Sequence, residues 1–184
     1  FGVKTAPNQL YAVAIAGGKI YVPTVSASPE GAPKFNTNVQ SVVYVGDIAG
    51  KKEDTSNVGT ANLNELVKLA DFKGGPRHFI ADPVDIAFVG DTVAYVIGRG
   101  SDVVQRVEYN AANGVKIGST VNLQIDVLPA PAGAPDGCRG PIGIVAGHGN
   151  SKAYVNCWAS RRLSVVDLAK QEAETTVESY APPS

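Results

Sequence analysis

Residues Pro141–Val155 read PIGIVAGHGNSKAYV, which is an apolar run, a turn with two glycines and a second run that ends in Tyr-Val. Two earlier stretches have the same plan: Pro83–Val96 reads PVDIAFVGDTVAYV, and Leu10–Val22 reads LYAVAIAGGKIYV. Short apolar runs on both sides of a Gly-containing turn are typical of β-hairpins. The sequence therefore predicts the same hairpin three times.

A third strand is expected after each hairpin, and each of these strands ends near an acid. The acids are Asp47, Glu108 and Asp167, which lie 61 and 59 residues apart (108 − 47 and 167 − 108). A carboxylate at the end of a strand can accept backbone N–H bonds from the next turn. We therefore expect the three acids to form turns rather than a functional site.

Fourth strands are expected at Thr60–Leu63, Thr120–Leu123 and Thr175–Glu178. In the first unit, Asn62–Phe72 also carries apolar residues at helical spacing, so a short helix is the alternative there. Four short antiparallel strands that recur along a chain are typical of the blades of a β-propeller. The sequence thus predicts an all-β fold, a partial β-propeller of about three four-stranded antiparallel blades.

The predicted units cover about residues 8–65, 66–125 and 126–180 of one partial propeller that spans 1–184. These units are longer than the usual blade of about 40–45 residues. The excess is assigned to loops at Pro23–Gln40, Leu66–Asp82 and Leu128–Gly140.

A propeller ring has about 4–8 blades, and each blade buries its faces only against its neighbours. Three blades leave two open faces, so we expect the chain to be a fragment of a larger ring that further blades or another chain completes. The chain begins with Phe1 and contains no Met, which we interpret in the same way. A β-prism-like or sandwich arrangement of the three units is the alternative.

The composition and the motifs argue against several classes of protein. The formal net charge is −1, so the sequence indicates no basic surface for nucleic acid. No apolar stretch reaches the roughly 18 residues of a membrane span. The sequence also lacks the motifs of a nucleophile elbow, a phosphate loop and c-type haem attachment. It therefore predicts no catalytic residue, no metal site and no cofactor held by this chain, and no turnover by the chain alone.

Cys138 and Cys157 are the only cysteines. Cys138 lies in the loop that leads into a predicted hairpin, and Cys157 ends the second strand of that hairpin. The two ends of a hairpin lie close together, as a disulfide requires, and a disulfide implies an oxidising compartment. Two buried thiols are the alternative. A metal pair ranks third, because no His lies at ligand spacing.

Five residues are candidates for partner binding: Arg77, His78, Trp158, Arg161 and Arg162. Trp and Arg are enriched in the hot spots of protein interfaces, and a loop His can carry a proton near neutral pH. On sequence alone, however, the favoured interpretation is more ordinary. In it, His78 is a plain loop histidine, Trp158 packs between blades, and the two arginines after it are solvated.

The third unit carries a family resemblance. Its segments Lys152–Asn156 (KAYVN) and Arg161–Asp167 (RRLSVVD) resemble the YVTN-type bacterial propeller repeat, in which a Tyr-Val-Thr/Ala-Asn strand precedes a Val-Ser-Val-Ile-Asp strand. Segments Cys138–Ile144 and Asn156–Trp158 are similar to exported propellers joined to c-type haem domains of the di-haem peroxidase type. The resemblance implies a periplasmic or extracellular location, and a haem c in an adjoining c-type cytochrome domain.

Three functions are compatible with these features. The first is a non-catalytic extracytoplasmic scaffold that binds a protein or domain through its loops. The second, implied by the resemblance, is the substrate-side or docking domain of a c-type haem redox enzyme, for electron transfer or peroxidase-like chemistry. The third is a structural subunit of a multi-chain assembly. Because one fold hosts many functions, the choice has to come from the side chains that the fold brings together.

Overall fold

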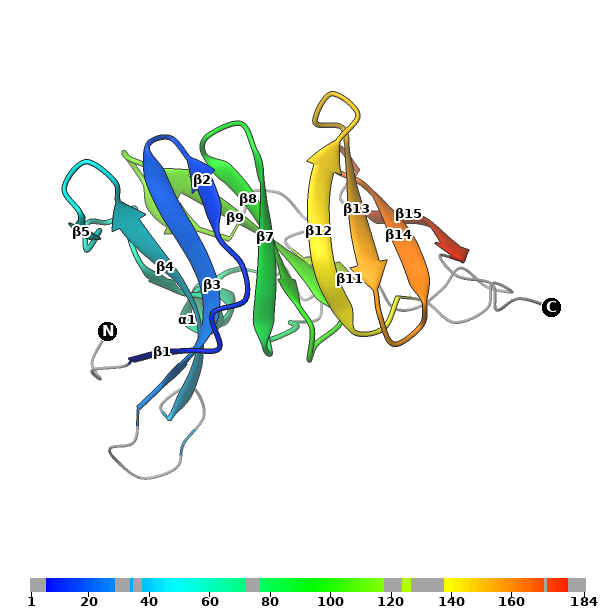
Figure 1. Cartoon of the computed structure of the whole chain (residues 1–184), viewed down its shortest axis with the longest axis horizontal. Helices are drawn as coiled ribbons and strands as arrows, with labels where there is room; N and C mark the ends of the chain where they lie inside the picture. The colour runs from blue at the N-terminus through cyan, green and yellow to red at the C-terminus, as the bar shows by residue number, and fades with distance from the viewer. Residues whose placement is uncertain are drawn as a thin grey trace.

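The computed structural model describes residues 6–28, 34, 38–71, 77–117, 124–126, 138–170 and 172–178, and for 124–126 and 172–178 it describes the backbone alone. In this part of the chain, three antiparallel sheets follow one another along the sequence and stand side by side (Figure 1). The fold is all-β and is that of a partial propeller, as predicted.

Each sheet is built from consecutive strands. The first contains β1 (Ala6–Asn8), β2 (Ala14–Ala16), β3 (Lys19–Ala27), β4 (Val39–Asp47), β5 (Lys52–Glu53) and β6 (Ala61–Asn62). The second contains β7 (Pro83–Val89), β8 (Val93–Gly98), β9 (Val103–Asn110), β10 (Gly114–Lys116) and β11 (Gln124–Asp126). The third contains β12 (Pro141–Gly147), β13 (Lys152–Cys157), β14 (Arg162–Asp167) and β15 (Glu172–Glu178).

The acids at the ends of the third strands occupy equivalent places in the sheets. Asp47, Glu108 and Asp167 each pair with the residue that opens the preceding strand, namely Lys19, Val93 and Lys152. Two of them form turns as predicted. The Asp47 carboxylate accepts the N–H of Ala49, and the Asp167 carboxylate accepts the N–H groups of Lys170 and Ala169, which lower the pKa of the Asp167 carboxyl.

The prediction that Glu108 forms a turn was wrong. Its carboxylate instead pairs with Arg106 on the same strand. Asn110, two residues further along, accepts the backbone N–H groups of Ala112 and Asn113. An Asn side chain can form the same turn as an Asp, so the second sheet keeps the turn and moves it to the end of a longer strand.

The fourth strand of the first unit is shorter than predicted, and the helical alternative applies to the residues directly after it. After β6, helix α1 spans Leu63–Leu69. The side chain of Asn62 accepts the backbone N–H groups of Asn64 and Glu65, both at 3.1 Å, which caps the helix. The predicted strand at Thr120–Leu123 lies outside the described residues.

Part of the loop predicted at Pro23–Gln40 is strand, since Pro23–Ala27 belong to β3 and Val39–Gln40 to β4. β3 continues through Pro23 to Ala27 and pairs with β4 along its whole length. Thr24, Ser26 and Ser28 are all buried, so small polar side chains alternate with a period of two, as in a strand. Because these residues are polar, the sequence shows no apolar run here that would indicate a strand.

Hydrophobic cores fill both seams between neighbouring sheets, so the middle sheet is buried on both faces. The first seam packs Tyr21, Val43, Ile86, Val96 and Tyr109 together with other apolar residues of the first two sheets. The second seam packs Val84, Ile97, Val104, Ile144 and Val155 with their neighbours. Burial of each sheet against the next is how consecutive blades gain stability. In the described part of the chain, no helix is long and apolar enough to cross a membrane.

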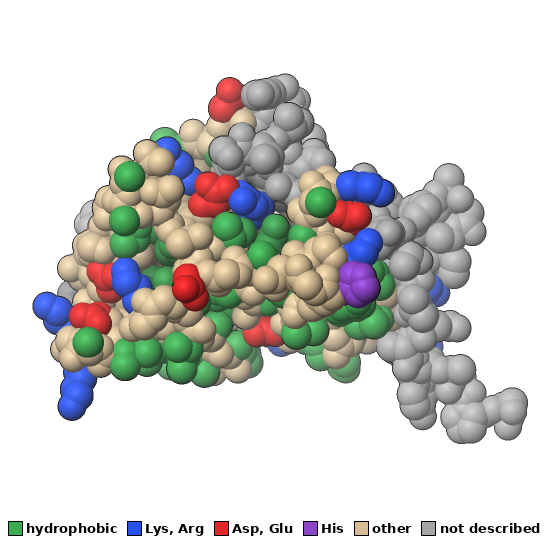
Figure 2. Space-filling model, turned by 90° about the horizontal axis from the view of Figure 1, so that it is seen from above, with side chains coloured by type: hydrophobic (Ala, Val, Ile, Leu, Met, Phe, Trp, Pro, Cys, Tyr) green, Lys and Arg blue, Asp and Glu red, His purple; other side chains and the backbone are tan. Residues whose placement is uncertain are grey.

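Strands β2, β7 and β12 lie on one side of the molecule, where Figure 1 shows them in front. Several apolar side chains in or next to these strands are exposed, namely Val13, Ile15 and Val145. Figure 2, seen from above, shows hydrophobic side chains gathered along its lower edge. This side therefore presents apolar surface that the described residues do not cover.

Candidate functional site

The loop that leads into the second sheet is fastened to the β8–β9 turn by three hydrogen bonds. The Arg99 N–H donates to the carbonyl of Asp82 at 3.0 Å, and the Gly100 N–H donates to the carbonyl of Ala81 at 3.0 Å. In return, the Ala81 N–H donates to Ser101 Oγ at 3.3 Å. The loop and the turn thus form one rigid unit.

The third sheet repeats this arrangement bond for bond. The Trp158 N–H donates to the carbonyl of Gly140 at 3.0 Å, and the Ala159 N–H donates to the carbonyl of Arg139 at 3.1 Å. The Arg139 N–H donates to Ser160 Oγ at 3.1 Å. Asp82 and Gly140 occupy the same position in the two units and share a positive φ, of 54° and 60°. We call residues 77–82, 98–102, 138–140 and 157–162 together the loop face.

A disulfide between Cys138 and Cys157 anchors the third unit, with the two Cα atoms 5.1 Å apart and both residues fully buried. The equivalent residues of the second sheet are Ile80 and Gly98, since Gly98 pairs with Pro83 as Cys157 pairs with Pro141. A Cβ on Gly98 would lie 3.1 Å from Ile80 Cγ2. At this position, the second sheet is held by packing of Ile80 against Gly98, and the third sheet is held by the disulfide.

Trp158 is 70% exposed, so it does not pack between two of the described sheets, as the ordinary interpretation expected. It occupies the turn position that Arg99, a half-buried residue, occupies in the second sheet. Arg139 and Arg161 beside it are exposed, and Arg162 at the start of β14 is half-buried. The structure therefore brings three of the five predicted binding residues together and adds Arg139, which sequence reasoning missed.

The remaining two predicted residues, Arg77 and His78, precede the second sheet. Arg77 is exposed and donates from Nη2 to the carbonyl of Ala70 after α1, at 2.9 Å. His78 is half-buried, and Phe79 next to it is exposed. These residues form a second group on the loop face, because they lead into a different sheet from the one that carries Trp158.

On the second sheet, Arg99 is held in place by its neighbours. Its Nε donates to Asp82 Oδ2 at 2.6 Å, and its guanidinium lies 5.2 Å from the centre of the Tyr11 ring. The Tyr11 hydroxyl and the Asp82 carboxylate both raise the pKa of Arg99. This arginine therefore acts within the fold, tying the segment before β2 to the second sheet.

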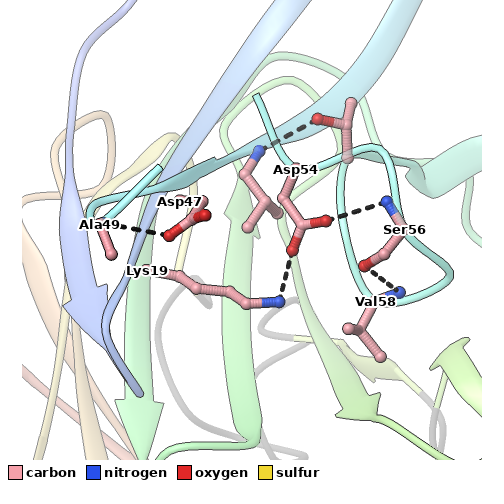
Figure 3. Close-up of polar contacts among 8 residues, drawn as sticks. Lys19, Asp47, Ala49, Asp54, Ser56 and Val58 are labelled. Carbon is pink, nitrogen blue, oxygen red and sulfur yellow. Dashed lines mark hydrogen bonds and ion pairs between the residues drawn. The ribbon is translucent and has the colours of Figure 1, made fainter. Parts of the chain in front are cut away.

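The opposite end of the sheets carries residues 17–19, 47–54, 90–92, 148–152 and 167–170, and we call it the turn face. Its best-defined polar contact is between Lys19 and Asp54, at 2.5 Å, and Asp54 also accepts the N–H of Ser56 (Figure 3). These bonds lower the pKa of Asp54 to about 2.

A hollow of about 340 Å³ lies nearby on the second sheet, lined by residues that include Thr92, Glu108 and Asn110. Within the described ranges, no group of three His, Cys, Asp or Glu side chains could hold a metal ion.

No protein-family model and no curated protein sequence matches the chain. Solved structures do match its fold. Hydrazine synthase from Kuenenia stuttgartiensis is 19% identical with a TM-score of 0.57, over 99% of this chain and 40% of that one. A functionally unknown protein from Desulfotomaculum acetoxidans DSM 771 is 9% identical with a TM-score of 0.53, over 98% of this chain and 58% of that one. The chain thus spans about half the length of these structures, and the likeness concerns the fold alone.

Proposed function

We propose that this chain is the binding part of an extracytoplasmic propeller scaffold and that it docks a partner protein or domain through the loop face, with Trp158 as the anchor. The observation that carries the proposal is the presentation of Trp158. A large aromatic side chain stands mostly in solvent on a turn fixed by backbone hydrogen bonds and a disulfide. Trp is enriched in binding hot spots, and a turn whose backbone is already ordered loses little entropy on binding.

The extracytoplasmic location rests on the disulfide. Disulfides persist in oxidising compartments such as the periplasm and are rare in the cytosol. Cys138 and Cys157 are fully buried at the base of the Trp158 turn, so their bond would shape the proposed binding surface directly. Further blades, either in the same polypeptide or in another chain, complete the ring in this proposal.

A second candidate is a docking domain of a c-type haem redox enzyme, with the haem in an adjoining domain. It is favoured by the similarity of the fold to part of an enzyme, hydrazine synthase. Haem absorbance in the protein purified from its native source would support this role. A native protein free of haem would leave the scaffold role.

The test of the scaffold role is site-specific cross-linking. A photo-reactive amino acid in place of Trp158, in the protein as its own cells produce it, is expected to cross-link to one discrete partner or to another domain. The same amino acid in place of Lys51, which is exposed on the turn face, is the matched control. Equal cross-linking from both positions, or none from position 158, would contradict the proposal.

A further inference from the structure

The arginines of this chain are concentrated on the loop face. The sequence has six, and five of them belong to this face: Arg77, Arg99, Arg139, Arg161 and Arg162. The sixth, Arg106, is paired with Glu108 on β9. The turn face carries lysines and acids instead, among them Lys19, Lys51, Lys52, Asp47, Asp54, Asp91 and Asp167. The two ends of the sheets therefore differ in the kind of cation that they present.

The β8–β9 turn and the β13–β14 turn can be compared directly, because both make the same backbone hydrogen bonds to the loop that leads into their sheet. In the second sheet, the positions around Ser101 hold Ala81, Asp82, Arg99 and Asp102. Their formal charges sum to −1. The equivalent positions in the third sheet hold Arg139, Gly140, Trp158 and Arg161. These sum to +2.

The fold does not require the third set of side chains. The second sheet makes the same three hydrogen bonds with a small residue in place of Arg139 and an acid in place of Arg161. Within the described part of the chain, neither Arg139 nor Arg161 forms an ion pair, whereas Arg99 is paired with Asp82. The neighbouring acid Asp102 accepts the N–H of Gly140 at 2.7 Å, and the two arginine side chains stay exposed.

We propose that the partner surface recognised here is an acidic polypeptide segment, with carboxylates that pair with Arg139 and Arg161 and an apolar or aromatic side chain that packs on Trp158. This inference rests on the proposed function and specifies the chemistry of its partner. Arginine pairs with carboxylates through two parallel hydrogen bonds, which suits a peptide side chain. A nucleic acid or another extended polyanion fits less well, because the whole chain has a net charge of −1.

Trp158 is the only Trp of the chain, so its fluorescence reports binding at this site directly. The probe is a random copolymer of Glu and Tyr, with a copolymer of Lys and Tyr and with heparin as comparisons. The Glu–Tyr copolymer is expected to change the Trp158 emission, with affinity that falls as salt is added. The variant R139Q/R161Q is expected to bind this probe at least about tenfold more weakly, since two charge-assisted contacts are lost. The variant K51Q/K52Q, which removes two exposed cations from the turn face, is the matched control and should bind within about twofold of the parent.

Equal binding of the Lys–Tyr copolymer, or an unchanged affinity of R139Q/R161Q, overturns the inference. Binding of heparin without binding of the Glu–Tyr copolymer also overturns it and indicates a site for polyanions. Cross-linking from position 158 distinguishes failure of this inference from failure of the scaffold role. A cross-linked partner with a neutral or basic contact segment contradicts the acidic partner alone, whereas the absence of both cross-linking and copolymer binding contradicts the binding role as well. Circular dichroism melts of both variants verify that each is folded.

Discussion

The carboxylate of Asp85 on β7 accepts the backbone N–H of Ile144 on β12 at 2.8 Å. This bond joins the second sheet to the third at the edge strands, where no strand pairing exists between the sheets in the described part of the chain. The other oxygen of Asp85 accepts the N–H of Ile86. A Cβ on Gly143, next to Ile144, would lie 3.8 Å from Asp85 Oδ2, which is an ordinary van der Waals contact, so the bond does not depend on a glycine there. The seam thus contains a polar bond beside its apolar core.

Removal of the Asp85 carboxylate should weaken this seam. In Asp85→Ala the N–H of Ile144 loses its acceptor, which we expect to cost about 1–3 kcal/mol of unfolding free energy. Asp85→Asn keeps an oxygen that can accept the same bond and should cost less than half as much. Chemical denaturation of the three proteins measures the difference. Equal losses in the two variants would mean that charge, rather than the hydrogen bond, stabilises the seam.

Loss of the Cys138–Cys157 disulfide should destabilise the third sheet. The bond closes a loop with a sequence separation of 19, for which loop-closure entropy gives about 3 kcal/mol. The variant C138A/C157A is therefore expected to lose about that much unfolding free energy and to unfold at a lower denaturant concentration. Ile80→Ala, which empties the equivalent corner of the second sheet, should cost roughly 2–5 kcal/mol by loss of packing. Reduction with a thiol reagent should destabilise the parent protein and leave C138A/C157A unchanged.

The Lys19–Asp54 pair predicts a specific dependence on pH. The pKa of Asp54 is lowered from 3.8 to about 2, chiefly by its hydrogen bond to Lys19. A carboxyl with a lowered pKa in the folded state stabilises the fold above its unfolded pKa and loses that effect as the pH falls through the folded value. Asp54→Asn should therefore be less stable than the parent by about 1–2 kcal/mol near neutral pH, and the difference should shrink between roughly pH 4 and pH 2. A difference that stays constant over this range would assign the stability to packing.

The repeat could be predicted from sequence wherever short apolar runs flank a Gly-containing turn. The hairpins of the second and third sheets follow directly from Pro83–Val96 and Pro141–Val155. The inner part of β3 could not, because Thr24 and Ser26 are buried polar residues whose bonds reach β1 at Asn8 and Ala6. Such bonds depend on a strand brought from elsewhere in the chain, which a local pattern does not contain.

The loop face could be predicted only in part, for a similar reason. Trp158 and Arg161 could be identified by residue type. The two turns, however, are joined to their loops by Ser101 and Ser160, and a serine carries no signal of this role in the sequence. Their equivalence depends on a spacing of 59 residues between two turns that differ in nearly every other side chain. Arg139 becomes a candidate binding residue only through the comparison with Ala81, which shows that the fold does not require an arginine at this position.

Trp158→Ala should separate stability from binding. Because the side chain is 70% exposed and the turn is held by backbone bonds that an Ala can also make, we expect the unfolding free energy to change by no more than about 0.5 kcal/mol. Loss of a hot-spot Trp should nevertheless weaken binding of the cross-linked partner by about 2 kcal/mol, or roughly 30-fold. Calorimetric titration measures the affinity, since this variant has no Trp to report it.

Phe79→Ala is the matched control for that experiment, because Phe79 is also an exposed aromatic residue of the loop face but leads into the second sheet. If Trp158 is the anchor, the Phe79 variant should keep its affinity within about threefold, as residues around a hot spot usually do. A large loss of stability in Trp158→Ala would instead show that the indole supports the fold. Equal losses of affinity in both variants would indicate a broad apolar surface, with the energy spread over two sheets rather than focused on one turn.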